Sequence, residues 1–310
     1  MLMLRARLPE LALLGVVVVW ASTYVVTKRA FAEISPLAFA FVRFGAITVL
    51  AFVVLAASRA SWRVLKSDLP RFVAAGVCAY TLYQLGFVLG LERTSPFSSA
   101  LLIGTVPLFT IALLAVLGER PPLRAWIGVA AAILGTAVFV ADKLGAPESL
   151  LGDLLSLGSA VSFAVYGIVN RPLVKRYATA TYTAYTILAG AIPLLLISTP
   201  AALVQDWGAV SASSWLVVAY MTVLPVYVAY IVWNWAIARR GAAAASAFTL
   251  LVPIASGFLS VLFYGEDFDL AKALGAGLVM VGLLLLQRRP SEMPTMHIRE
   301  DVRPDAVPPG

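Results

Sequence analysis

The chain has 310 residues, of which 61% are hydrophobic and only 13% are charged, and its mean hydropathy is +0.92. This composition excludes soluble enzymes and nucleic-acid-binding proteins, because so few charges could not cover a water-soluble core; it predicts that lipid surrounds most of the surface. The single cysteine, Cys78, excludes an intramolecular disulfide, and the single histidine, His297, lies in the Pro-rich C-terminal tail. We therefore expect no metal site, no cofactor and no histidine-based catalysis in the membrane.

Ten apolar runs follow one another along the chain, each close to the roughly 20 residues that a helix needs to cross a bilayer. They cover residues 10–28, 36–57, 72–91, 95–117, 123–141, 152–170, 178–198, 214–237, 242–263 and 270–287. Runs of this length are too long for the strands of a membrane barrel. The first run is also too long for a signal-peptide core. The predicted fold class is therefore an all-α integral membrane protein with ten transmembrane helices, followed by a disordered cytoplasmic tail at 288–310.

The basic residues are distributed unevenly between the two sets of loops that ten spans would create. The N-terminus, the loops on its side and the tail hold 17 of the 23 Lys and Arg residues, and the opposite loops hold five. Arg43 lies inside the second run. Because positive residues concentrate on the cytoplasmic side, we expect both termini in the cytoplasm.

A sequence pattern occurs twice, as a Gly-Glu pair followed by glycines 9 and 16 residues after the glutamate. The two copies are Gly118-Glu119 with Gly128 and Gly135, and Gly265-Glu266 with Gly275 and Gly282. The segment TYVVTKR at 23–29 similarly matches VYGIVNR at 165–171. The pattern predicts two five-helix repeats, residues 10–141 and 152–287, and an odd number of spans turns the second repeat upside down. Inverted repeats of this kind are typical of transporters with a central site that opens to either side.

The segments that carry this pattern resemble the EamA family of the drug/metabolite transporter superfamily. They are WASTYVVTKR, ISPLAFAFVRFGAIT, ERTSPFSSALLIGTVPLFTIALLAVLGER and AAAASAFTLLVPIASGFLSVLFYGED. The resemblance extends over residues 10–287, and it is strongest to bacterial exporters of aromatic amino acids of the YddG type. It implies a ten-helix protein of the bacterial inner membrane that exports amino acids or other metabolites.

Hydroxyl, amide and aromatic side chains inside the apolar runs are the candidate substrate contacts, because polar groups at membrane depth face the bundle interior or a wet cavity. Aromatic rings would stack on an apolar side chain, and hydroxyls and amides would hold a zwitterionic head group. Hydrogen bonding between helices accounts for about half of these residues, so both interpretations stay open. The candidates are Trp20, Thr23, Tyr24, Tyr80, Tyr83, Gln84, Ser98, Ser99, Tyr166, Tyr227, Tyr230, Asn234 and Ser246.

Three further residues inside the runs have both a functional and a structural interpretation. Arg43 lies seven residues, or about 10 Å, into the second run. It could bind a substrate carboxylate, or it could reach the interface or pair with Glu33. Pro107 and Pro253, near the middle of the fourth and ninth runs, each remove a backbone hydrogen bond. Both are candidate hinges, and a fixed shape for the bundle is the alternative.

The positions of the acidic residues bear on energy coupling. All 16 Asp and Glu residues fall in loops, at helix ends or in the tail. Since proton and Na⁺ coupling usually uses carboxylates in the path, we expect an uncoupled uniporter that works by alternating access. It would act as a monomer and carry neutral amino acids, preferentially aromatic ones and also methionine. A multidrug or other metabolite exporter of the same fold is the nearest alternative, and a channel is a more distant one; hydrolase and protease motifs are missing.

Overall fold

The structure, a computed structural model, describes residues 8–141, 147–240, 248–267 and 269–287, and these ranges are helical apart from their connections. Eight helical segments are long and apolar enough to cross a membrane, and two shorter apolar helices, Leu251–Tyr264 and Leu270–Leu286, follow them. The all-helical fold is therefore confirmed for the described residues. The predicted tail at 288–310 lies outside them.

The described helices are, in chain order, α2 (Leu8–Ala30), α3 (Pro36–Ala57), η1 (Lys66–Asp68), α4 (Leu69–Gly76), η2 (Val77–Leu82), α5 (Tyr83–Arg93), α6 (Pro96–Ile103), α7 (Val106–Val116), α8 (Leu123–Ala141), α9 (Pro147–Val169), α10 (Arg171–Arg176), α11 (Thr179–Val204), α12 (Ala212–Val223), η4 (Leu224–Val228), α13 (Ala229–Arg240), α15 (Leu251–Tyr264) and α16 (Leu270–Gln287). The segments η2 and η4 are π-helical turns that interrupt the third and eighth predicted runs. Such turns widen a helix locally and are frequent at functional sites.

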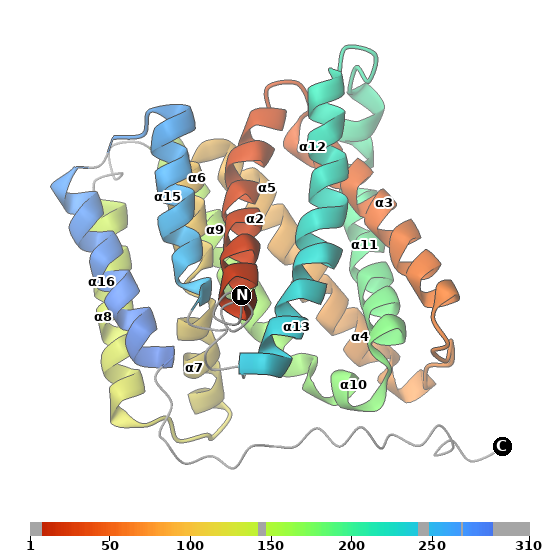
Figure 1. The fold of residues 1–310 in the computed structure, drawn as a ribbon, viewed down its shortest axis with the longest axis horizontal. Coiled ribbons are helices and arrows are strands. Elements are labelled where there is room, and N and C mark those ends of the chain that lie inside the picture. The colour runs from red at the N-terminus through yellow and green to blue at the C-terminus, as the bar shows by residue number, and fades with distance from the viewer. Residues whose placement is uncertain (1–7, 142–146, 241–247, 268, 288–310) are drawn as a thin grey trace.

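Helices from the two halves of the chain pack against each other throughout the bundle. The helix α8 pairs with α16 at one edge, and α3 pairs with α11 toward the opposite edge (Figure 1). Between these pairs, α5 packs on α9, and α2 packs on α13 and α15. The core that these contacts bury contains Tyr24, Phe44 and Phe87, whereas the many exposed Leu, Val and Ile side chains face outward, as a lipid-facing surface requires.

The fourth predicted run is two helices rather than one kinked helix. The helix α6 ends at Ile103 and α7 begins at Val106, so Pro107 lies in the first turn of a new helix, where no backbone donor is needed. In the same way, a turn at Leu250 precedes α15, and Pro253 is the third residue of that helix. The expected kinks at the two prolines are therefore helix breaks, because each proline restarts a helix.

These two breaks contact each other in the middle of the bundle. A Cβ atom added to Gly104, the residue that directly follows α6, would lie 3.3 Å from the Cγ atom of Pro253. The short helix α6 also packs along α15. The ring of Pro253 thus packs against the C-terminal end of α6.

The close pairing of α8 with α16 depends on glycines. A Cβ atom on Gly135 would lie 2.5 Å from the backbone nitrogen of Val279 and 2.7 Å from the carbonyl oxygen of Gly275. Seven residues earlier in α8, Gly128 approaches Gly282 in a similar way. A Cβ atom on Gly128 would lie only 2.8 Å from the Gly282 carbonyl oxygen. Helices in lipid associate largely through such small-residue contacts. These glycines therefore serve the close packing of α8 against α16.

The substitution Gly135→Ala should destabilise the protein by about 1–3 kcal/mol, because the new methyl group meets backbone atoms that cannot move aside. The measurement is thermal unfolding of the purified protein in detergent. Gly277→Ala, on the same helix pair, is the matched control, since a Cβ there meets nothing within 4 Å. Equal unfolding temperatures for the two variants would contradict the close approach.

Candidate functional site

Tyrosine and phenylalanine rings from three helical segments meet in the interior. The Tyr24 ring of α2 stands edge-on to Phe87 of α5, with ring centroids 5.6 Å apart. Tyr83 stacks parallel to Phe87 at 6.4 Å and lies 5.2 Å from Phe163 of α9. Ring pairs at these separations attract beyond their burial alone. The structure thus brings the predicted residues Tyr24 and Tyr83 together.

The same group of rings continues along α9. The rings of Phe163 and Tyr166 are 5.2 Å apart, and Tyr166 is 6.5 Å from Tyr80 of η2. The Tyr166 hydroxyl is hydrogen-bonded to that of Tyr182 on α11. The residues Tyr24, Tyr80, Tyr83, Phe87, Phe163 and Tyr166 are called the central aromatic cluster below.

Arg43 and Gln84 lie beside the central aromatic cluster. The Arg43 side chain is buried in α3, and its Nη1 atom donates to Gln84 Oε1 at 3.2 Å. Its Nε atom donates to the carbonyl oxygen of Met221 at 3.3 Å. Its Cζ atom lies 5.4 Å from the centre of the Phe44 ring, and that ring is 6.0 Å from the Tyr80 ring of the cluster. Of the alternatives for Arg43, reaching the interface and pairing with Glu33 do not occur in this structure, because partners on α5 and α12 hold the guanidinium inside.

Glu33 is engaged elsewhere, at the connection between α2 and α3. Its carboxylate accepts hydrogen bonds from the backbone nitrogen of Ser211 at 2.8 Å and from the Ser211 hydroxyl at 2.9 Å. These bonds, the backbone one foremost, lower the pKa of Glu33. The charged carboxylate of Glu33 therefore stabilises the start of α12.

Three other predicted residues form hydrogen bonds within and between helices. Trp20 donates its Nε1 hydrogen to the carbonyl oxygen of Pro225 at 3.2 Å, and its ring lies 5.2 Å from that of Trp233. Thr23 donates to the Trp20 carbonyl oxygen at 2.6 Å. The Tyr227 hydroxyl lies 3.5 Å from the carbonyl oxygen of Ile47. These contacts join α2 and α3 to η4 and agree with the structural interpretation of such residues.

Ser98 and Ser99 belong to a different polar group, near the start of α6. Ser99 accepts from the Ser156 hydroxyl of α9 at 3.1 Å, and Ser98 lies 2.9 Å from the Ser95 hydroxyl oxygen. Both side chains are fully buried. The structure does not join them to the central aromatic cluster. Of the remaining predicted contacts, the Tyr230 and Asn234 side chains and the whole of Ser246 lie outside the described part.

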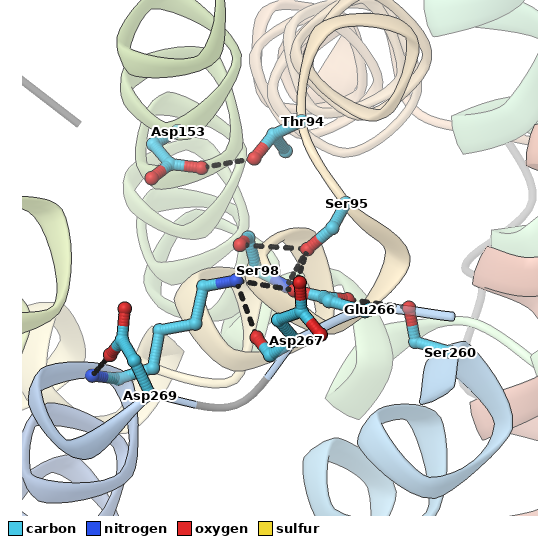
Figure 2. Close-up of polar contacts among 9 residues, drawn as sticks. Thr94, Ser95, Ser98, Asp153, Ser260, Glu266, Asp267 and Asp269 are labelled. Atoms are coloured by element: carbon cyan, nitrogen blue, oxygen red, sulfur yellow. Dashed lines mark hydrogen bonds and ion pairs between the residues drawn. The ribbon is translucent and has the colours of Figure 1, made fainter. Parts of the chain in front are cut away.

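A second site, which the sequence did not predict, surrounds the carboxylate of Glu266. Figure 2 shows Ser95 and Ser260 both directed at this carboxylate, and each donates a hydrogen bond of 2.6 Å. Lys272 adds an ion pair at 3.3 Å. Because these side chains come from the start of α6, from α15 and from α16, the Glu266 network, as these four residues are called below, joins three helices at one end of the bundle.

Two contacts strengthen the same end of the bundle. The Lys28 ammonium of α2 donates to the carbonyl oxygens of Leu91, Glu92 and Thr94 at 2.6–2.9 Å, and so satisfies the end of α5. The Thr94 hydroxyl donates to the fully buried Asp153 at 2.5 Å (Figure 2). The sequence placed Lys28 and Glu266 at helix ends but gave no signal of these partners, which are distant in the chain.

The corresponding glutamate of the first half has a different environment. Glu119 pairs with Arg171 at 3.4 Å, and both side chains are more than half exposed. Both glutamates follow a glycine with positive φ, Gly118 at 91° and Gly265 at 60°, a backbone conformation that ends a helix. The two ends of the bundle thus share a glycine with positive φ before the glutamate. They differ in that Glu266 is held by its network, whereas Glu119 is exposed.

Comparison with known proteins agrees with the structure. A terminal-alkyne amino-acid exporter, described as probable, from Streptantibioticus cattleyicolor is 29% identical over 72% of this chain and 74% of its own length. A protein of Escherichia coli K12, described as a probable amino-acid metabolite efflux pump, is 27% identical over 89% of this chain and 93% of its own. A solved crystal structure shares the fold, with a TM-score of 0.58, 23% identity and coverage of 90% of this chain and 96% of that one.

The model of the EamA-like transporter family matches residues 7–141 and again residues 150–288. Those two ranges cover nearly all of the described helices, and the relatives named above are described as a probable exporter and a probable efflux pump. This chain is therefore a multi-pass membrane protein that belongs to the EamA-like transporter family.

Proposed function

We propose that the protein exports neutral amino acids, with aromatic side chains preferred and methionine also accepted, across the bacterial inner membrane. The central aromatic cluster carries this proposal, because stacked tyrosine and phenylalanine rings inside a transporter suit an apolar or aromatic side chain. The names of two relatives, an amino-acid exporter and an amino-acid metabolite efflux pump, support the same substrate class. The resemblance to exporters of the YddG type points to aromatic amino acids within that class.

The proposed architecture is ten transmembrane helices in two inverted repeats, residues 10–141 and 152–287. Two contacts support it. Asp68 accepts from Arg176 at 2.7 Å, and Glu33 accepts from Ser211 at 2.8 Å. Positions 68 and 211 differ by 143 residues, as do positions 33 and 176, close to the 142 residues between the matched segments 23–29 and 165–171, so the two contacts would be equivalent under the proposed repeat. The two π-helical turns, the two broken helices and the twofold match of the family model support the same repeat.

The proposed orientation places both termini in the cytoplasm, since the basic residues concentrate on that side. The Glu266 network then lies at the opposite, non-cytoplasmic end. One fused chain supplies both repeats, so the proposed functional unit is a monomer without cofactor, which contacts only its substrate and the bilayer.

Transport would be uniport by alternating access, driven by the gradient of the substrate itself. The buried carboxylates support this, because they are hydrogen-bonded near helix ends: Asp68 to Tyr177 at 2.7 Å, Asp153 to Thr94, and Glu266 within its network. A proton carrier would have to exchange its proton with both sides of the membrane. In this mechanism, the hydrogen bonds of the Glu266 network would break each time the substrate site opens to the non-cytoplasmic side.

The test of the proposed function is flux of radiolabelled phenylalanine, tryptophan and methionine in proteoliposomes that contain the purified protein. We expect saturable flux that an imposed pH gradient leaves unchanged. Accumulation against a substrate gradient in response to the pH gradient would disprove uniport but keep the substrate class. Absence of flux for all three amino acids would remove the substrate proposal.

Replacement of Tyr83 by alanine should reduce phenylalanine flux by about tenfold, because it removes a ring that contacts both Phe87 and Phe163. Asn234→Ala should impair flux in the same assay. Membrane insertion should be normal for both variants. Tyr185→Ala is the matched control, since Tyr185 packs on Phe52 and Phe72 and donates to the Trp62 carbonyl oxygen, and none of these residues belongs to the cluster. Wild-type flux in both test variants would refute the cluster as a binding site.

Glu266→Gln should favour the outward-open state, because it removes the charge that Lys272 and two serines stabilise. In a Cys78→Ser background with Ser99→Cys as the reporter, labelling by an impermeant maleimide from outside should accelerate by on the order of fivefold. Glu119→Gln is the control, since the exposed Glu119 should leave the rate unchanged. Equal rates in the two glutamine variants would show that the Glu266 network does not close this end.

A further inference from the structure

Arg43 is a buried cation in the interior of a membrane protein. Its side chain is 8% exposed, and the residue lies seven positions into α3, about 10 Å from the helix start. An isolated charge in apolar surroundings is strongly unfavourable unless an opposite charge or several hydrogen bonds compensate it. The partners of Arg43 therefore determine what the site can bind.

Every partner of Arg43 in the described part of the chain is neutral. The guanidinium donates to the Met221 carbonyl oxygen and to Gln84 Oε1, and its Cζ atom lies 5.4 Å from the centre of the Phe44 ring. A guanidinium carries five N–H groups, and these contacts use two of them. No Asp or Glu among the described residues forms an ion pair with it. The positive charge thus has no counter-ion from the described side chains.

Gln84 provides a second donor beside this charge. Because a guanidinium can only donate, the oxygen of the Gln84 amide must face Arg43, and its Nε2 group points to the other side. This Nε2 atom is buried and has no hydrogen-bond partner among the described residues, although Gln84 is only 2% exposed. Buried donors without a partner are rare in proteins and call for a missing acceptor.

The two unsatisfied donor groups, one of them charged, define an anion site. Tyr83, the neighbour of Gln84 in sequence, belongs to the central aromatic cluster, and Phe44, whose ring lies against the guanidinium, is 6.0 Å from the Tyr80 ring of the same cluster. An aromatic wall and a cationic donor pair thus lie side by side. A ligand that matches both parts has an apolar side chain and a carboxylate.

We propose that Arg43 and Gln84 bind the carboxylate of the transported substrate, and that the protein therefore discriminates against amines that lack this group. The inference rests on the proposed function for the identity of the substrate, but it makes its own claim about which part of the substrate is recognised. Charge-assisted hydrogen bonds from a guanidinium and an amide to a carboxylate would satisfy both donors. The carboxylate would also supply the missing counter-ion of Arg43.

A purely structural role for Arg43 makes a different prediction about one substitution. Gln84→Glu keeps the shape of the side chain and places a carboxylate 3.2 Å from the guanidinium. So close to Arg43 this glutamate should be ionised. If Arg43 serves only to join α3 to α5 and α12, the new ion pair keeps that connection and transport is retained. If Arg43 receives the substrate carboxylate, the glutamate occupies its place and blocks binding.

The experiment measures ligand-induced thermal stabilisation of the purified protein by phenylalanine, 3-phenylpropionate and phenethylamine, together with phenylalanine flux. We expect the wild type to be stabilised by the two carboxylates and not by the amine. Gln84→Glu should fold with at least wild-type stability, yet bind both carboxylates about tenfold or more weakly. Gln84→Met, which removes the Nε2 donor without adding charge, should weaken binding less, and it replaces the glutamate variant if that variant does not fold.

Equal stabilisation by phenethylamine and phenylalanine, or unchanged binding in both Gln84 variants, would overturn the inference. The outcomes also separate it from the proposed function. Phenylalanine flux that survives Gln84→Glu refutes carboxylate recognition and keeps the amino-acid exporter. Binding of 3-phenylpropionate that depends on Gln84, without flux of any amino acid, supports carboxylate recognition and refutes the exporter of neutral amino acids.

Discussion

The requirement that polar groups find partners within the protein governs this structure, because the surrounding hydrocarbon offers none. Lys28 meets it by covering three carbonyl oxygens at the end of α5, and Glu266 meets it with two serines and a lysine. Both arrangements lie at helix ends, where charges are least costly. Arg43 departs from that pattern, since it lies well inside α3 with neutral partners. A charge kept at such a position without a counter-ion from the described side chains is the feature that most clearly favours a binding role over packing alone.

The two halves of the chain share features of the backbone but differ in the chemistry of their side chains. A glycine with positive φ ends a helix in each half, at Gly118 and Gly265, and a π-helical turn occurs in each, at η2 and η4. At the 143-residue offset, Arg43 corresponds to Thr186, whose hydroxyl donates to the Tyr182 carbonyl oxygen within its own helix. The two halves therefore share how these helices end and turn, whereas the buried charge of Arg43 has no counterpart at Thr186. In the proposed transporter, this difference would favour a single orientation of the substrate.

The sequence predicted the all-helical class and the approximate position of each apolar run, because length and hydrophobicity decide which segments lie in lipid. It also listed Tyr24 and Tyr83 among the candidates that face the interior, since hydroxyls at membrane depth must face inward, and the structure packs both rings on Phe87. It marked Pro107 and Pro253 as positions that lose a backbone hydrogen bond, and the structure breaks the helix just before each of them. Ser98 and Ser99 were placed with the aromatic residues, although they pack at the helix end beside Ser95 and Ser156. Partners that are distant in the chain, such as Ser95 and Glu266 at 171 positions, leave no local pattern, so tertiary contacts alone reveal them.

The broken helices connect the end of the bundle to its centre. Ser95, at the start of α6, and Ser260 of α15 both bind Glu266, and the inner end of α6 contacts the Pro253 ring of α15 through Gly104. A continuous helix would have to bend to open this end, and bending stretches backbone hydrogen bonds. Because α6 ends at Ile103 and α15 begins at Leu251, the proposed alternating access would let these two short helices move as units once the Glu266 network separates. The breaks would then lower the cost of opening, the network would set the free energy that must be overcome, and the balance between the two would decide how often the proposed site faces outward.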